Sequence, residues 1–157
     1  VKAYTYMDQA TEQEIDVHDA LESTLSVLQH KLNGIEIDRA YTPNLPRIPA
    51  YGSELNQVWT ILLDNAADAV ADGGSISVHT SQESDYVLVE ICDTGCGIPA
   101  ELHSRLFEPF FTTKPVGQGT GLGLSIARRI VVDRHRGMIN AESRPGETRF
   151  QVFLPIA

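Results

Sequence analysis

The stretch ELNQVWTILLDNAADAV, residues 54–70, decides the fold of this chain. Its apolar residues recur at steps of three and four, which keeps them on one side of a helix. We therefore predict a helix over residues 54–71, ended by Asp72, Gly73 and Gly74. The predicted buried stripe is Leu55, Val58, Trp59, Leu62, Ala66, Ala69 and Val70. On or near the opposite face lie Gln57, Ile61, Asp64, Asn65, Asp68 and Asp72.

The segments around this helix predict a single mixed domain. Residues 17–32 carry apolar side chains at helical spacing, and residues 121–135 predict a third helix. Alternating or apolar runs predict five strands, over residues 35–41, 75–80, 86–93, 138–143 and 148–155. The second and third strands form a hairpin, as do the last two. The fold class is therefore α+β, with the helices on one face of the sheet.

The connecting segments have predictions of their own. TEQEID, residues 11–16, is a polar hinge, and the proline-containing residues 42–53 form an extended connector. Residues 93–120 are rich in glycine and form a long functional loop, with one short helical turn near residues 101–107.

Composition limits the possible functions. The 157 residues are 42% hydrophobic, enough for one buried core, and the formal charge of −9 disfavours binding to nucleic acid. No apolar run reaches about 18 residues, so we expect no membrane contact and a cytoplasmic location. The chain begins without Met, which suggests a piece of a longer protein whose parent could be membrane-anchored. Cys92 and Cys96 are expected to be reduced thiols rather than metal ligands.

Asp93 and the glycines after it indicate recognition of adenine. The segment DTGCGIP, residues 93–99, places the carboxylate at the end of a predicted strand, and Gly95 and Gly97 would let backbone approach a planar ring closely. A carboxylate accepts hydrogen bonds from an exocyclic amine and rejects a purine with oxygen at that position. Adenine is therefore preferred over guanine.

Two further features indicate a triphosphate. The carboxamide oxygen of Asn65 can ligate Mg²⁺, whose remaining ligands are phosphates and water. The alternating glycines of GQGTGLGLS, residues 117–125, precede a predicted helix, whose N–H groups can face phosphates. Lys114 could contact a terminal phosphate, and the phenylalanines of FEPFFTTK, residues 107–114, form the apolar latch of a lid. The spacing of the glycines in residues 117–125 matches neither the dinucleotide-binding motif nor the P-loop motif.

Four segments follow one another along the chain: residues 54–70, 93–99, 107–114 and 117–125. In this order they resemble the motifs of the ATP-binding catalytic domain of sensor histidine kinases, within the superfamily of gyrase, Hsp90 and MutL. The resemblance implies a two-layer Bergerat fold, a mostly antiparallel mixed sheet packed on three helices, with ATP and Mg²⁺ as ligands. It assigns Asn65 and Lys114 to catalysis and Asn65 to the metal. The implied nucleotide-binding residues are Asn65, Asp68, Asp93, Gly95, Gly97, Ile98, Phe110, Thr112, Lys114, Gly119, Thr120, Gly121, Leu122, Gly123 and Leu124.

Two positions depart from the family pattern. Ile61 stands where the family often has Asn and where its ATP hydrolases have a Glu that activates water. Because Ile61 cannot accept a proton, we expect poor hydrolysis, with transfer as the reaction. Asp68 stands where a basic residue is frequent, which makes Lys114, Arg128 and Arg129 candidates for neutralising phosphate charge.

The resemblance also implies partners. Residues 1–12 are expected to be the end of a dimerisation helix and a hinge, and residues 13–157 the catalytic domain. The phosphoacceptor His would lie on a separate upstream dimerisation domain of a homodimeric parent, because His18 starts the catalytic domain's own first helix. A cognate response regulator would receive the phosphoryl group. The alternatives left open are an ATP-binding scaffold that transfers nothing, an ATPase clamp and a serine kinase.

Overall fold

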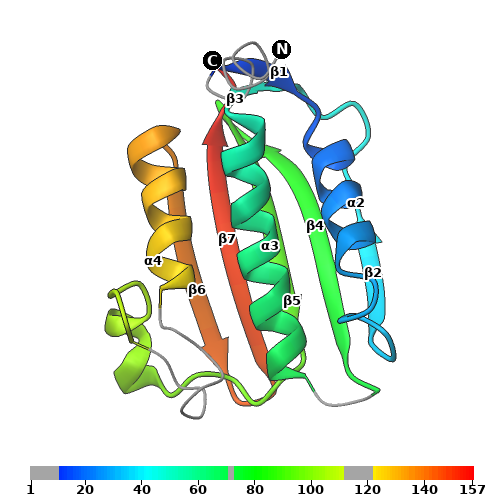
Figure 1. The fold of residues 1–157 in the computed structure, drawn as a ribbon, viewed down its shortest axis with the longest axis vertical. Coiled ribbons are helices and arrows are strands. Elements are labelled where there is room, and N and C mark those ends of the chain that lie inside the picture. The colour runs from blue at the N-terminus through cyan, green and yellow to red at the C-terminus, as the bar shows by residue number, and fades with distance from the viewer. Residues whose placement is uncertain (1–10, 71–72, 112–121) are drawn as a thin grey trace, which may run out of the picture.

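The computed structural model describes residues 11–70, 73–111 and 122–157. Within these residues a five-stranded sheet is covered on one face by three helices (Figure 1). The strand order is β2-β4-β5-β7-β6, with β2 and β4 parallel and the other neighbours antiparallel. The predicted α+β class and the mostly antiparallel mixed sheet are confirmed.

The five strands match the sequence prediction closely. Their bounds are Glu36–Ala40 for β2, Ser75–Glu83 for β4, Tyr86–Asp93 for β5, Met138–Arg144 for β6 and Glu147–Pro155 for β7. β4 and β5 form the predicted hairpin, and β6 and β7 form another. Side chains alternate along β7, where every second residue is buried, because one face of the sheet packs against the helices.

Helix α3, Gly52–Ala69, is the central helix of the layer and begins and ends two residues before the predicted bounds. Its buried residues are Leu55, Val58, Trp59, Leu62, Leu63, Ala66 and Ala67. The predicted stripe is thus correct along its first three turns. Towards the end it is wrong, because Ala67 is buried while Ala69 and Val70 are only partly covered.

Helix α2, Val17–Val27, is shorter than predicted, because residues 28–34 form turns rather than a continued helix. The apolar spacing predicted burial of Val17, Leu21, Leu25, Leu28 and Leu32, and all of these are buried except Leu28, which is partly buried. Asp16 caps the start of the helix by accepting hydrogen bonds from the backbone N–H groups of His18 and Asp19.

The segment predicted as a polar hinge contains a strand, which corrects that prediction. β1, Gln13–Ile15, pairs antiparallel with β3, Ile48–Ala50, inside the predicted extended connector. Ile48 and Ala50 are fully buried, and Ile15 packs against the core. Burial of these apolar side chains therefore stabilises the short β1–β3 pair at the end of the domain.

The third helix begins at Gly123, as the glycine pattern predicted. It consists of α4, Gly123–Arg128, and a π-helical continuation η2, Arg129–Arg134. A short 3₁₀ segment η1, Ala100–Arg105, confirms the predicted helical turn. Among the described residues, no helix combines the length and the apolar character needed to cross a membrane.

Candidate functional site

Asp93 ends β5 and is 4% exposed, so its carboxylate lies inside the protein. Its Oδ1 accepts a hydrogen bond from the backbone N–H of Gly95 at 2.9 Å. Burial raises the pKa of Asp93, and the bond from Gly95 opposes this rise. The described part of the chain provides no second hydrogen bond to this carboxylate, which leaves acceptor capacity for a ligand.

Gly95 and Gly97 lie where the backbone of two other elements leaves no room for a side chain. A Cβ on Gly95 would lie 2.4 Å from the carbonyl oxygen of Ala69, and one on Gly97 would lie 2.4 Å from that of Arg144. Protein backbone therefore lies on the side of each glycine where a Cβ would project. Gly97 also has φ +81°, a conformation that favours glycine. The two glycines fix the loop against α3 on one side and the β6–β7 hairpin on the other.

Thr148 is a candidate site residue that the sequence did not predict. It is 3% exposed and lies directly opposite Asp93 in the β5–β7 pair, so both side chains project from the same face of the sheet. Its Oγ1 lies 2.9 Å from Ser143 Oγ on β6. Register across the RPGE turn pairs Ser143 with Thr148, and that pairing was the available signal.

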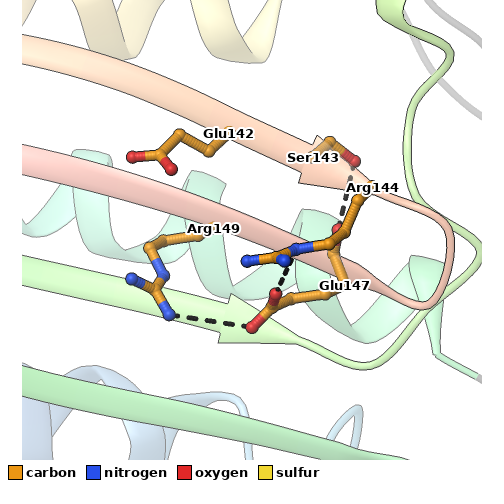
Figure 2. A pocket seen from close by; sticks show the side chains of 5 residues that line it. All are labelled: Glu142, Ser143, Arg144, Glu147 and Arg149. Atoms are coloured by element: carbon orange, nitrogen blue, oxygen red, sulfur yellow. Dashed lines mark hydrogen bonds and ion pairs between the residues drawn. The ribbon is translucent and has the colours of Figure 1, made fainter.

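The β6–β7 hairpin that carries these residues is held by ion pairs on its outer side (Figure 2). Arg144 Nε lies 3.0 Å from Glu147 Oε1, and Arg149 Nη2 lies 3.7 Å from Glu147 Oε2. Together with Glu142 and Ser143, these residues line a small polar pocket at the end of the hairpin. The lining of this pocket therefore combines two acidic and two basic side chains.

Asn65 is half-buried on α3, one turn after Ile61. A Cβ on Gly123 at the start of α4 would lie 3.2 Å from Ile61 Cγ2, so Ile61 packs against α4. The expectation that Ile61 and Asn65 share a face places Asn65 on the same side of the helix. Ile61 therefore fills an interhelical contact where a hydrolase would need a proton acceptor.

Asp68 forms an ion pair with Lys31, a residue that was not predicted from the sequence to be near it. Lys31 Nζ lies 2.7 Å from Asp68 Oδ1 and 2.9 Å from Asp64 Oδ1, bridging one turn of α3 from the segment after α2. Hydrogen bonds to the two carboxylates raise the pKa of Lys31. A positive charge from another element thus stands beside Asp68.

The phenylalanines of the predicted latch behave differently from one another. Phe107 packs edge to face on Phe150 of β7, with ring centroids 6.5 Å apart, and so joins the core. Phe110 is 74% exposed at φ 69°, and Phe111 lies under the guanidinium of Arg105. Only Phe107 is anchored in the manner expected of a latch.

Other predicted residues fall into two groups. Thr112, Lys114, Gly119, Thr120 and Gly121 lie outside the described residues. Leu122 precedes α4, whose first two residues are Gly123 and Leu124, and Ile98 lies in the loop after β5. Arg128 and Arg129 are exposed where α4 passes into its π-helical continuation.

The cysteines and His18 have structural surroundings. Cys92 and Cys96 are both free thiols, and the described residues contain no cluster of three or more side chains suited to a metal. His18 stacks on Tyr41 with ring centroids 4.4 Å apart, and its Nε2 lies 2.7 Å from Thr80 Oγ1. These contacts tie His18 to the end of the sheet beside α2.

A buried carboxylate at the end of a central strand, a glycine loop held against it and a helix carrying Asn65 define a nucleotide-binding α/β sandwich. Residues 50–157 match the model of the family described as histidine kinase-, DNA gyrase B-, and HSP90-like ATPase. The chain belongs to this family, and it is an ATP-binding catalytic domain of the sensor histidine kinase type.

Relatives of known name support this assignment. The chain is 38% identical to the sensor kinase CckA of Brucella abortus, over 90% of this chain and 17% of that protein. It is 34% identical to the sensory histidine kinase/phosphatase NtrB of Rhizobium leguminosarum bv. phaseoli, over 90% of this chain and 40% of that protein. The chain therefore spans less than half the length of these curated relatives.

Solved structures agree over nearly the whole chain. The catalytic domain of histidine kinase ThkA, in a nucleotide-free form, superposes with a TM-score of 0.85 at 31% identity, covering 92% of this chain and 95% of that one. The mycobacterial sensor histidine kinase MprB gives a TM-score of 0.83 at 27% identity, covering 92% and 97%. Another structure contains ThkA in complex with the response regulator protein TrrA.

Proposed function

We propose that this chain binds ATP with Mg²⁺ and, within a longer sensor kinase, transfers the γ-phosphoryl group to a His on a separate domain. The observation that carries the proposal is the buried carboxylate of Asp93, which retains acceptor capacity beside a fixed glycine loop. An acceptor in that position suits the amino group of adenine. The chain covers 17% and 40% of the two sensor kinases compared, which agrees with a catalytic domain that acts on a separate acceptor domain.

Asn65 is the residue that we assign to the metal. Its neutral carboxamide oxygen is a ligand that Mg²⁺ accepts, and it lies half-buried on the side of α3 that meets α4. When bound, the metal ion would neutralise charge on the phosphates. Lys114 remains our candidate for a direct contact to the terminal phosphate.

The transfer itself needs little from this domain beyond positioning and charge compensation. The nucleophile is a nitrogen of the acceptor His, which attacks the γ-phosphorus while the bond to the β-γ bridging oxygen breaks and ADP leaves. Ile61 cannot accept a proton, so water is not activated from this position, one turn before Asn65. That feature favours transfer over steady ATP hydrolysis.

We propose the partners of the parent protein by the same reasoning. They are an upstream dimerisation and phosphoacceptor domain, a second copy of the parent through that domain, and a cognate response regulator. ThkA has been captured with the response regulator TrrA, which supports an equivalent docking for this domain. We further propose that residues 1–12 lead into the upstream domain.

The Asp93→Asn variant tests the nucleotide assignment. Asn places an amide where a charged acceptor faces the amine of adenine, so we expect affinity for ATP to fall about tenfold to a hundredfold. Isothermal titration of ATP with excess Mg²⁺ measures this change. Asp85→Asn is the matched control, because Asp85 is exposed in the β4–β5 turn. Unchanged affinity in Asp93→Asn would refute the assignment.

An ATP-binding scaffold remains a second candidate. Asp68, paired with Lys31, occupies a position where a basic residue is frequent in the family, and this could slow or abolish transfer. Incubating the full-length parent with γ-labelled ATP separates the two, because a kinase acquires acid-labile label on His and a scaffold stays unlabelled.

A further inference from the structure

Three polar side chains form a row across neighbouring strands at the end of the sheet. Ser143 on β6 is paired with Thr148 on β7, and Thr148 is paired with Asp93 on β5. Directly opposite residues in antiparallel strands project from the same face, so the three side chains are adjacent. Thr148 and Asp93 are buried, and Ser143 is partly exposed.

The hydroxyl of Ser143 has three neighbours and only one hydrogen. Its Oγ lies 2.7 Å from the backbone N of Ile98, 2.9 Å from Thr148 Oγ1 and 3.2 Å from the carbonyl oxygen of Glu147. The N–H of Ile98 can only donate, and the carbonyl of Glu147 can only accept. All three bonds form together only when Ser143 donates to Glu147 and Thr148 donates to Ser143.

This arrangement determines what Thr148 offers to a ligand. Because its single hydrogen is committed to Ser143, its remaining capacity is as an acceptor. Asp93 beside it is also an acceptor, with Oδ1 held by the N–H of Gly95. Two neighbouring acceptors complement a ligand group with two hydrogens, such as an exocyclic amine.

Ser143 also fixes the loop that follows Asp93. Its bond to the N–H of Ile98 holds one end of the loop, and His103 Nε2 lies 2.9 Å from the carbonyl oxygen of Ile98. Gly97 rests against the carbonyl of Arg144, the residue after Ser143. The β6–β7 hairpin and the loop are thus joined at one side chain.

We propose that Ser143 is a positioning residue for base recognition: it keeps Thr148 turned as an acceptor and holds the loop beside Asp93, and thereby sets the preference for an amino-bearing purine. This inference rests on the proposed nucleotide site. Ser143 acts through Thr148 and the loop without contacting the base.

The test compares ADP with IDP, which carries oxygen in place of the amino group. Titration of the 157-residue chain in excess Mg²⁺ gives the ratio of the two affinities. In Ser143→Ala, Thr148 can turn its hydrogen towards the base, so ADP binding weakens about fivefold to tenfold while IDP binding changes less than about twofold. Ser143→Thr, which keeps the hydroxyl, restores the ratio. Ser77→Ala, on the outer face of β4, leaves it unchanged.

Three results would overturn the inference. One is an unchanged ADP-to-IDP ratio in Ser143→Ala, while Asp93→Asn still loses ADP, and this leaves the proposed function intact. Another is an equal loss of both nucleotides in Ser143→Ala, which marks a purely structural role. A wild-type chain that does not prefer ADP overturns the inference and the adenine assignment together. If Ser143→Ala does not fold, Thr148→Val replaces it, and the same fall in ratio is expected.

Discussion

The carboxylate of Asp93 is buried at the end of β5, and this burial raises its pKa above the ordinary aspartate value of about 4. The folded state therefore binds the proton more tightly than the unfolded state. Stability is present at low pH and decreases as the pH rises from the unfolded pKa through the folded one. At neutral pH the charge needed for recognition acts against the ligand-free fold.

Asp93→Asn should consequently stabilise the ligand-free protein at pH 7 and have a smaller effect near pH 4, because protonation of the wild-type carboxyl removes the buried charge as the pH falls. Urea unfolding of both proteins at the two pH values measures the difference. Asp85→Asn, at an exposed position, serves as the control. A stabilisation of equal size at both pH values would show that burial of the charge is not its cause.

Gly95→Ala should destabilise the fold without any ligand present. The new Cβ would lie 2.4 Å from the carbonyl oxygen of Ala69, so backbone must shift, at a cost of about 1–3 kcal/mol. Chemical denaturation gives the free energy of unfolding. Gly52→Ala is the matched control, because its Cβ would meet only Ile15 Cδ1 at 3.4 Å. If both variants lost the same stability, the packing of the loop on α3 would not explain Gly95.

Among the elements, long periodic segments were predictable and short paired ones were not. α3 was placed within two residues, because its 18 residues carry a continuous apolar stripe. β1 has three residues, too few for any alternation to be visible, and it exists because Ile48 and Ala50 bury against the core. α2 ends earlier than predicted from its apolar spacing. That spacing continues to Leu32, but residues 28–34 form turns, and Leu32 is buried without being in a helix.

The candidate site divides in the same way. Asp93 and Asn65 could be proposed from the sequence because each lies in a local motif on a recognisable strand or helix. Thr148 and Ser143 escaped because their role depends on register between strands that are distant in sequence from Asp93. The close packing of Gly95 on Ala69 and of Gly97 on Arg144 was not predicted, since these contacts arise only from tertiary packing.

At the scale of the whole molecule, different elements lie at the two ends of the sheet (Figure 1). β1 and β3 lie at the end where β7 finishes, while Asp93, Thr148 and the start of α4 lie at the other. Any upstream domain that continues from β1 therefore joins the fold at the end away from the candidate site. The β1–β3 pair and the candidate site are therefore separated by the length of the central strands.

Truncation before and after β1 tests where the folding unit begins. A chain starting at Gln13 should unfold like the full sequence, whereas one starting at Val17 loses β1, the helix cap from Asp16 and the packing of Ile15. We expect this second truncation to cost about 2 kcal/mol or more, which urea unfolding would reveal. Equal loss in both truncations would place the boundary upstream of Gln13.

The loop after Asp93 is packed between Ala69 on one side and Arg144 on the other, so the base half of the proposed site is preformed. A preformed surface demands little ordering from what binds to it. Small aminopyrimidine or aminopurine fragments should therefore gain unusually high affinity per atom here, without needing the phosphates. This makes the β5 end of the sheet a suitable starting point for designing inhibitors of the domain.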